Sequence, residues 1–142
     1  MATSTPQPVT GIRPAWLPLE NQYGAVEAGT WWDIVVIDGD LGDQAAAHLV
    51  DATGSACGPV AATRYTCRWY FLVPIGTTEN WQEPESEALG RGNSFGLPGS
   101  LDGIMWPVRW VVPPRMCVRP PLVEADHLRQ ALEAARPVDG VS

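Results

Sequence analysis

The chain contains no lysine, so each of its nine basic residues is an arginine. Sixteen acidic residues outnumber them, which gives a net charge of −7 and an isoelectric point near 4.6. Proteins bind nucleic acids largely through basic side chains that displace counterions from the phosphates. The composition therefore argues against a broad nucleic-acid-binding face and leaves room only for a local cluster of arginines.

Cysteine, histidine and long apolar runs are also scarce. The three cysteines include no Cys-x-x-Cys pair, so they predict neither a zinc site nor a disulfide framework. Cys67 is expected to be buried on a strand and Cys57 to be exposed in a loop, while His48 and His127 belong to no metal-binding motif. No window is apolar enough to span a membrane, and the first residues lack the apolar core of a signal peptide. We therefore expect a cytoplasmic protein with reduced thiols.

The sequence contains enough apolar residues for one domain. With 142 residues, 45% of them hydrophobic, and seven tryptophans, the chain is expected to bury one core rather than two. The Pro- and Thr-rich residues 1–14 are predicted to form a flexible N-terminal tail, and residues 137–142 a short C-terminal tail. The single domain then occupies residues 15–136.

Two kinds of hydrophobic pattern predict an α+β domain. Residues 31–37 form a β-branched apolar run, which is typical of a central strand covered on both faces. Residues 41–50 repeat apolar side chains at four-residue spacing, which predicts a helix with Asp40 as its N-terminal cap. Residues 121–136 have an amphipathic pattern and predict a second helix.

Further strands are predicted on both sides of a glutamate-rich segment. Residues 59–63 and 67–73 are typical of a hairpin, and residues 94–97 and 108–112 of two more strands. The intervening residues 76–94 are expected to form a surface loop with about one helical turn. The expected fold is one mostly antiparallel sheet of about five strands, packed by two helices.

Three short motifs occur in the order found in one family of nucleotidyltransferases. They are Asp38-Gly39-Asp40 at the end of the apolar strand, the hairpin Thr63-Arg64-Tyr65-Thr66-Cys67-Arg68-Trp69-Tyr70-Phe71, and Asp102 followed by Trp110-Val111-Val112-Pro113-Pro114. Over residues 30–115 this arrangement resembles the catalytic half of the bifunctional primase–polymerase (Prim-Pol) domains of the archaeo-eukaryotic primase superfamily. The resemblance implies that Asp38, Asp40 and Asp102 bind Mg²⁺ or Mn²⁺, and that a histidine in the second motif contacts the nucleotide phosphates.

The aspartates also have ordinary structural interpretations. In an extended segment Asp38 and Asp40 project to the same side, where they could hold a divalent metal. The favoured interpretation is a strand-to-helix turn in which Asp40 caps the helix that follows. Asp102 precedes Gly103 and is typical of a turn.

The chain departs from the family pattern where the nucleotide would bind. Trp69 stands in place of the histidine, Thr66 and Cys67 replace two glycines, and Pro107-Val108 replaces the Gly-Gly pair before the last strand. An indole cannot replace a cationic phosphate ligand. We therefore expect a non-catalytic Prim-Pol-like binding or interaction module, connected with DNA replication or a mobile element.

Two alternative functions remain open. One is a metal-dependent nucleotidyltransferase or nuclease-like enzyme that uses Asp38, Asp40 and Asp102 with Mg²⁺ or Mn²⁺. The other is binding of single-stranded DNA or DNA ends through arginines near the hairpin and the last strand. These arginines are Arg64, Arg68, Arg109 and Arg115.

The tryptophans divide into two expected groups. Those predicted to lie on strands and to join the core are Trp31, Trp69 and Trp110. Those in predicted loops, where a tryptophan can anchor a protein partner or a second copy of the chain, are Trp16, Trp81 and Trp106.

Overall fold

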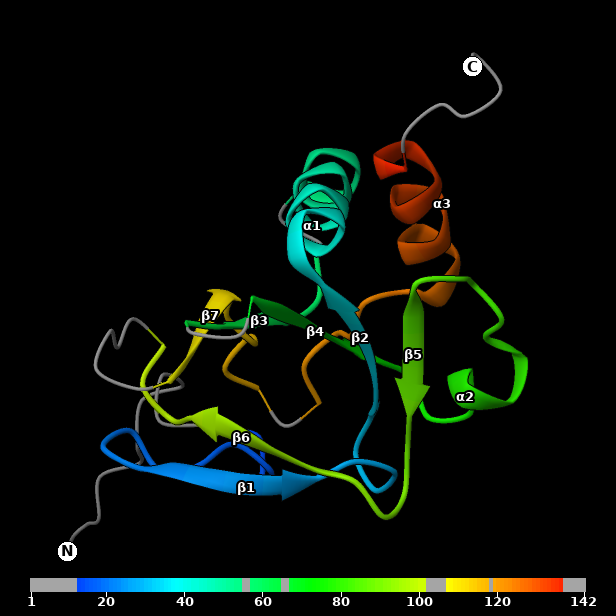
Figure 1. The fold of residues 1–142 in the computed structure, drawn as a ribbon. Helices are drawn as coiled ribbons and strands as arrows, with labels where there is room; N and C mark the ends of the chain where they lie inside the picture. Colours follow the sequence, from blue (N-terminus) through cyan, green and yellow to red (C-terminus); the bar gives the residue numbers. More distant parts are fainter. Residues whose placement is uncertain (1–12, 55–56, 65–66, 102–106, 118, 137–142) are drawn as a thin grey trace, which may run out of the picture.

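The computed structural model describes residues 13–54, 57–64, 67–101, 107–117 and 119–136, and it confirms an α+β fold (Figure 1). The described residues form two antiparallel sheets and three helices. The strands are β1 (Tyr23–Glu27), β2 (Asp33–Asp38), β3 (Val60–Thr63), β4 (Arg68–Val73), β5 (Ser86–Leu89), β6 (Ser94–Pro98) and β7 (Val108–Val112). The helices are α1 (Gly39–Thr53), α2 (Thr77–Asn80) and α3 (Ala125–Ala135).

The main sheet has five strands in the order β5-β2-β4-β3-β7, and every neighbouring pair is antiparallel. The main sheet therefore has the predicted five strands, but one of them differs from the prediction, and two further strands form a second sheet. The predicted strand at residues 94–97 is β6, which pairs with β1 in a separate two-stranded sheet. Its expected place in the main sheet is taken by β5, inside the segment that the sequence predicted as a loop.

Both faces of the main sheet are covered, as the apolar run of β2 predicted. Alternate side chains of β2 point to opposite faces. Val35 and Ile37 belong to the core under the helices, whereas Ile34 and Val36 belong to the core on the other face.

Helices α1 and α3 pack against each other on one face of the main sheet (Figure 1). Each contributes a stripe of alanines and leucines, as the helical periodicity predicted. Helix α1 is longer than the predicted residues 41–50 at both ends. Helix α3 begins at Ala125 rather than at 121, because the preceding backbone crosses the sheet instead, where the Val123 amide donates to the Leu72 carbonyl at 2.8 Å.

The two-stranded sheet and the N-terminal segment cover the other face of the main sheet. Trp16 packs edge-on against Trp32 with 5.5 Å between ring centroids, and Trp110 lies 6.2 Å from Trp16. The Trp110 indole N–H donates to the Pro98 carbonyl at 2.8 Å, which joins β7 to β6. None of the helices in the described part of the chain has the length and apolar character needed to cross a membrane.

Candidate functional site

The chain turns sharply at the end of β2, where the sequence predicted a pair of metal-binding carboxylates. The strand ends at Asp38, Gly39 follows with a φ of 67°, and Asp40 already lies in the first turn of α1. A positive φ of this kind favours glycine and takes the backbone out of the extended conformation. The expectation that both carboxylates project from one extended segment is therefore wrong, although both side chains are exposed. Asp102 lies outside the described residues.

The carboxylate of Asp38 has a partner within the chain. Its Oδ1 lies 3.3 Å from Nε of Arg68, which faces it across the antiparallel pair of β2 and β4. Asp38, and not Asp40 as the sequence predicted, is the residue at the N-cap position of α1, and its side chain makes no capping hydrogen bond. The ion pair with Arg68 directs the carboxylate toward β4.

Trp69, the residue in place of the family's histidine, lies on the opposite face of the sheet from Asp38. It pairs in register with Ile37 and packs with the core under the helices, whereas Asp38 and Arg68 alternate onto the other face. The indole lies against Gly42 in the first turn of α1, where a Cβ atom would be only 2.5 Å from Trp69 Cδ1. The indole and the Asp38 carboxylate therefore line no common pocket.

A hollow of about 320 Å³ does lie beside Asp38, on the face turned toward β6. Its lining includes Arg68, Glu85, Glu87 and Phe95. Within the described ranges, no three His, Cys, Asp or Glu side chains are grouped closely enough to hold a metal ion. The hollow is thus lined by acidic side chains, but these carboxylates do not converge on one point where they could share a metal ion.

The four arginines expected to form an anion site are spread over the sheet. Arg68 lies on one face, and Arg109 alternates with the buried Val108 and Trp110 onto the other. Arg64 follows the end of β3 that pairs with the first residue of β7, whereas Arg115 lies beyond the last residue of β7. No three of these four arginines therefore lie on the same face and at the same end of the sheet.

The tryptophans also differ from the sequence prediction. Trp16 and Trp81, expected in exposed loops, are only 7% and 8% exposed, whereas Trp31, expected in the core, is 49% exposed. The neighbouring Trp32 is fully buried in its place. Trp106 lies outside the described residues.

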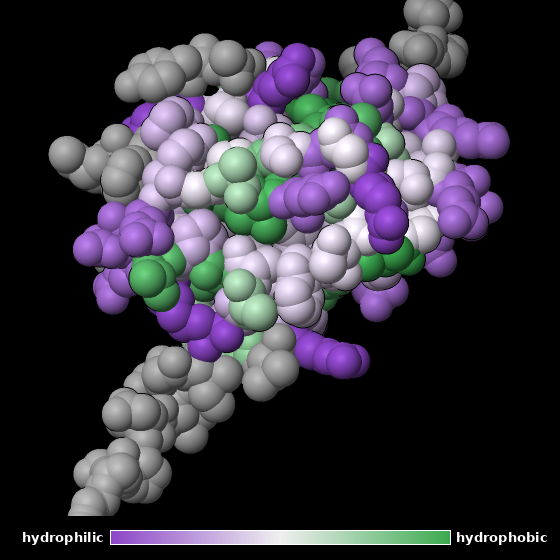
Figure 2. Space-filling model, turned by 90° about the horizontal axis from the view of Figure 1, so that it is seen from below, coloured by the Kyte–Doolittle hydropathy of each residue, from purple (hydrophilic) through white to green (hydrophobic). Residues whose placement is uncertain are grey.

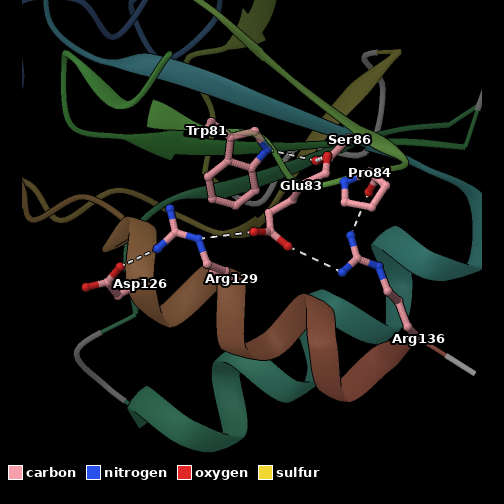
Figure 3. Close-up of polar contacts among 7 residues, drawn as sticks. All are labelled: Trp81, Glu83, Pro84, Ser86, Asp126, Arg129 and Arg136. Atoms are coloured by element: carbon pink, nitrogen blue, oxygen red, sulfur yellow. Dashed lines mark hydrogen bonds and ion pairs between the residues drawn. The ribbon is translucent and has the colours of Figure 1, made fainter. Parts of the chain in front are cut away.

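The burial of Trp81 has a clear structural cause (Figure 3). Its indole N–H donates to Ser86 Oγ at 2.8 Å, and the Arg129 guanidinium lies over its ring, 5.3 Å from the centroid. Glu83 accepts ion pairs from Arg129 and from Arg136, each at 3.3 Å. Trp81 and Glu83 therefore hold α3 against the chain that leads into β5.

The burial of Cys57 and Cys67 is the reverse of the prediction. Cys57 is buried, its Sγ lies 3.4 Å from the Gly58 carbonyl, and burial raises the pKa of its thiol. Cys67 is exposed and directly precedes β4, with a φ of 54°. A positive φ is uncommon for a residue other than glycine.

The exposed Trp31 and two arginines line a second hollow, which we call the Arg–Trp hollow. Its volume is about 600 Å³, and its lining includes Arg13, Trp16, Thr30, Trp31, Arg119 and Leu122. From the sequence, Trp16 was expected in an interaction surface and Trp31 in the core, and the other lining residues were not expected to form a site. The lining comes from three segments far apart in the chain, so no local motif marks the site.

Comparisons with known proteins give no relative for this chain. No protein-family model matches it, and neither a curated protein nor a solved structure matches it.

Proposed function

We propose that this protein is a non-catalytic binding module derived from a Prim-Pol-like domain, of the kind connected with DNA replication or mobile elements. The order of the three sequence motifs supports this descent, as does the position of β4 directly beside β2. One observation carries the non-catalytic part of the proposal. The Asp38 carboxylate is paired with Arg68, while Trp69 lies on the other face of the sheet, against Gly42.

The proposal has a simple electrostatic basis. Metal-dependent nucleotidyl transfer requires carboxylates that converge on the cations and positive groups that hold the transferred phosphates. At the end of β2, the positive charge of Arg68 lies beside the Asp38 carboxylate and opposes a cation there, and Asp40 belongs to the first turn of α1. The Trp69 indole carries no positive charge and offers a single N–H donor.

The binding part of the proposal is supported by the residues at the other end of β2. Trp31 precedes the strand and exposes 49% of its surface next to the Arg–Trp hollow. Exposed tryptophans and arginines dominate the binding energy of many interfaces. We assign binding to this end of the molecule, and a protein partner or a second copy of the chain remains among the possible occupants.

A primer-extension assay with Mn²⁺ and deoxynucleoside triphosphates tests the proposal. We expect no incorporation by the wild-type chain, by the D38N/D40N variant or by W69H, which restores the family's histidine. Calorimetric titration of Mn²⁺ with triphosphate is expected to give no heat that depends on Asp38 or Asp40. Incorporation by the wild-type chain that is lost in D38N/D40N would establish the enzymatic alternative instead.

A further inference from the structure

The walls of the Arg–Trp hollow are held in place by contacts outside it. Arg13 Nη2 donates hydrogen bonds to the carbonyls of Pro18 and Gly99, the latter at 2.9 Å. Trp16 is packed against Trp32 and Trp110 in the core. The part of the hollow formed by Arg13 and Trp16 is therefore in place before a ligand enters, which lowers the entropic cost of binding.

The hollow is positively charged in a protein that is strongly negative overall. Its lining contains Arg13 and Arg119 and, among its described residues, no carboxylate. Neither arginine forms an ion pair within the described part of the chain. The partners of Arg13 are neutral carbonyls, and its Nε is buried with no hydrogen-bond partner among the described residues. No carboxylate of the described residues thus neutralises either positive charge.

The hollow also offers a flat aromatic surface. Trp31 is the tryptophan with the largest exposure among the residues whose burial is described, and it lines the hollow together with Trp16 and Leu122. Aromatic rings of ligands stack readily on an exposed indole. The volume of about 600 Å³ lies within the usual range for sites of small organic ligands.

We propose that the Arg–Trp hollow binds a small organic anion with a planar aromatic ring, the ring against Trp31 and the anionic group against Arg119 and Arg13. The proposal rests on the proposed binding function and requires no metal ion. An aromatic carboxylate and a nucleoside monophosphate share this chemistry. A long polyanion does not fit as well, because a chain of net charge −7 repels its remaining charges.

Calorimetry in EDTA with four probes tests the ligand class. The anions are 1-naphthoate and adenosine 5′-monophosphate, and their neutral counterparts are 1-naphthamide and adenosine. We expect at least one anion to bind, and to bind about tenfold more tightly than its neutral counterpart. The anion that binds more tightly identifies the source as a carboxylate or a phosphate.

Three variants assign the binding to the hollow. W31A and R119Q are each expected to lower the affinity for the anion by about tenfold. R109Q removes the same charge from an exposed arginine on the opposite face of the sheet and is expected to leave the affinity unchanged. Both Trp31 and Arg119 are exposed, and circular dichroism confirms that each variant is folded.

The possible failures are distinguishable. If neither anion binds in EDTA, or if R109Q weakens binding as much as R119Q, the inference about the hollow is wrong, while the non-catalytic proposal is unaffected. If adenosine 5′-monophosphate binds only with Mn²⁺ and D38N abolishes this binding, the electrostatic argument against a metal–nucleotide site at Asp38, on which the proposed function depends, is wrong. A shift of the Trp31 indole N–H signal in nuclear magnetic resonance spectra, on addition of the anion, provides an independent readout of the contact.

Discussion

The close contact between α1 and Trp69 of β4 depends on Gly42. A Cβ atom at this position would lie 2.5 Å from Trp69 Cδ1 and 2.7 Å from the Ile37 carbonyl oxygen, and the latter cannot move without distorting β2. We expect Gly42→Ala to lower the free energy of unfolding by about 1–3 kcal/mol, the usual cost of overpacking. Urea unfolding measures this loss.

A second glycine provides the control for this prediction. In Gly24→Ala the added Cβ would meet only Pro18 Cγ, at an ordinary 3.8 Å. The control is expected to be as stable as the wild-type protein or slightly more stable, because alanine restricts the unfolded chain. Equal stability of the two variants would contradict the close packing of Trp69 on α1.

The cysteines give a second prediction for single residues. The reactive form of a thiol is the thiolate, and burial raises the pKa of Cys57 while Cys67 is exposed. At neutral pH we therefore expect a thiol reagent to modify Cys67 much faster than Cys57. Mass spectrometry of timed samples measures the order, and in guanidinium chloride both should react alike. Faster modification of Cys57 in the native protein would contradict its burial.

The sequence predicted the strand β2 to within two residues at each end, but it assigned Trp31, which precedes the strand, to the core. Alternation along an extended strand places Trp32 on the same face as Ile34 and Val36, and all three are buried. Trp31 comes one residue earlier, before the strand begins at Asp33. Two adjacent tryptophans look alike in a sequence, and only the register of the sheet decides which of them faces the core.

At the scale of elements, α3 depends on Glu83 for part of its attachment. This side chain is 18% exposed and accepts ion pairs from Arg129 and Arg136, while Arg136 also donates to the Pro84 carbonyl at 2.7 Å (Figure 3). Replacing Glu83 by alanine leaves two guanidinium groups without this partner. We expect the free energy of unfolding to fall by about 1–2 kcal/mol. The loss is limited because these side chains are partly exposed and solvent screens their charges.

A matched variant and a double-mutant cycle separate the ion pairs from general effects of charge. Glu133→Ala removes an exposed carboxylate from α3 and is expected to change the stability by less than about 0.5 kcal/mol. In the cycle, Glu83→Ala and Arg136→Ala should cost less together than the sum of their separate costs. Additive costs would mean that Glu83 does not hold α3.

The helices were easier to predict than two of the strands. The spacing of apolar residues in α1 and α3 is a local signal, and it located both helices. Strand β5 has the sequence Ser-Glu-Ala-Leu at the edge of the main sheet, where one side chain is exposed and the others are half-buried, so its composition resembles that of a loop. Strand β1 contains glycine and is paired only with β6, far along the chain. Edge pairing of this kind is decided by tertiary contacts.

The candidate sites belong to the scale of the whole molecule, and there the sequence was least informative. The motifs near Asp38 are contiguous and could be noticed, but the faces to which Asp38 and Trp69 point depend on strand register. The Arg–Trp hollow joins residues near positions 13, 31 and 119, which only the fold brings together. On the face formed by β1 and β6, hydrophobic side chains appear as separate small patches among polar ones (Figure 2). That face therefore offers no broad apolar surface that a sequence pattern could have revealed.

The charge of the whole molecule leads to the last prediction, which concerns single-stranded DNA. Arg68, Arg129 and Arg136 form ion pairs with carboxylates of the described residues, and the net charge of the chain is −7. Non-specific affinity for DNA requires several free cations on one face, since each neutralised phosphate contributes to counterion release. In a gel-shift assay at low salt, we therefore expect no shift of a thymidine oligonucleotide at protein concentrations of about 10 µM, in the range where basic proteins bind non-specifically.

An oligonucleotide with a 5′-phosphate distinguishes the hollow from a general DNA surface. A terminal phosphate and its base could reach Arg119 and Trp31, but the following phosphates would lie against an acidic chain, so we expect no shift here either. A shift seen only with the phosphorylated oligonucleotide and lost in R119Q would contradict this prediction and make the hollow a binding site for DNA ends. A shift seen with both oligonucleotides, and unchanged in R119Q, would require a nucleic-acid-binding face elsewhere and would contradict the argument from charge.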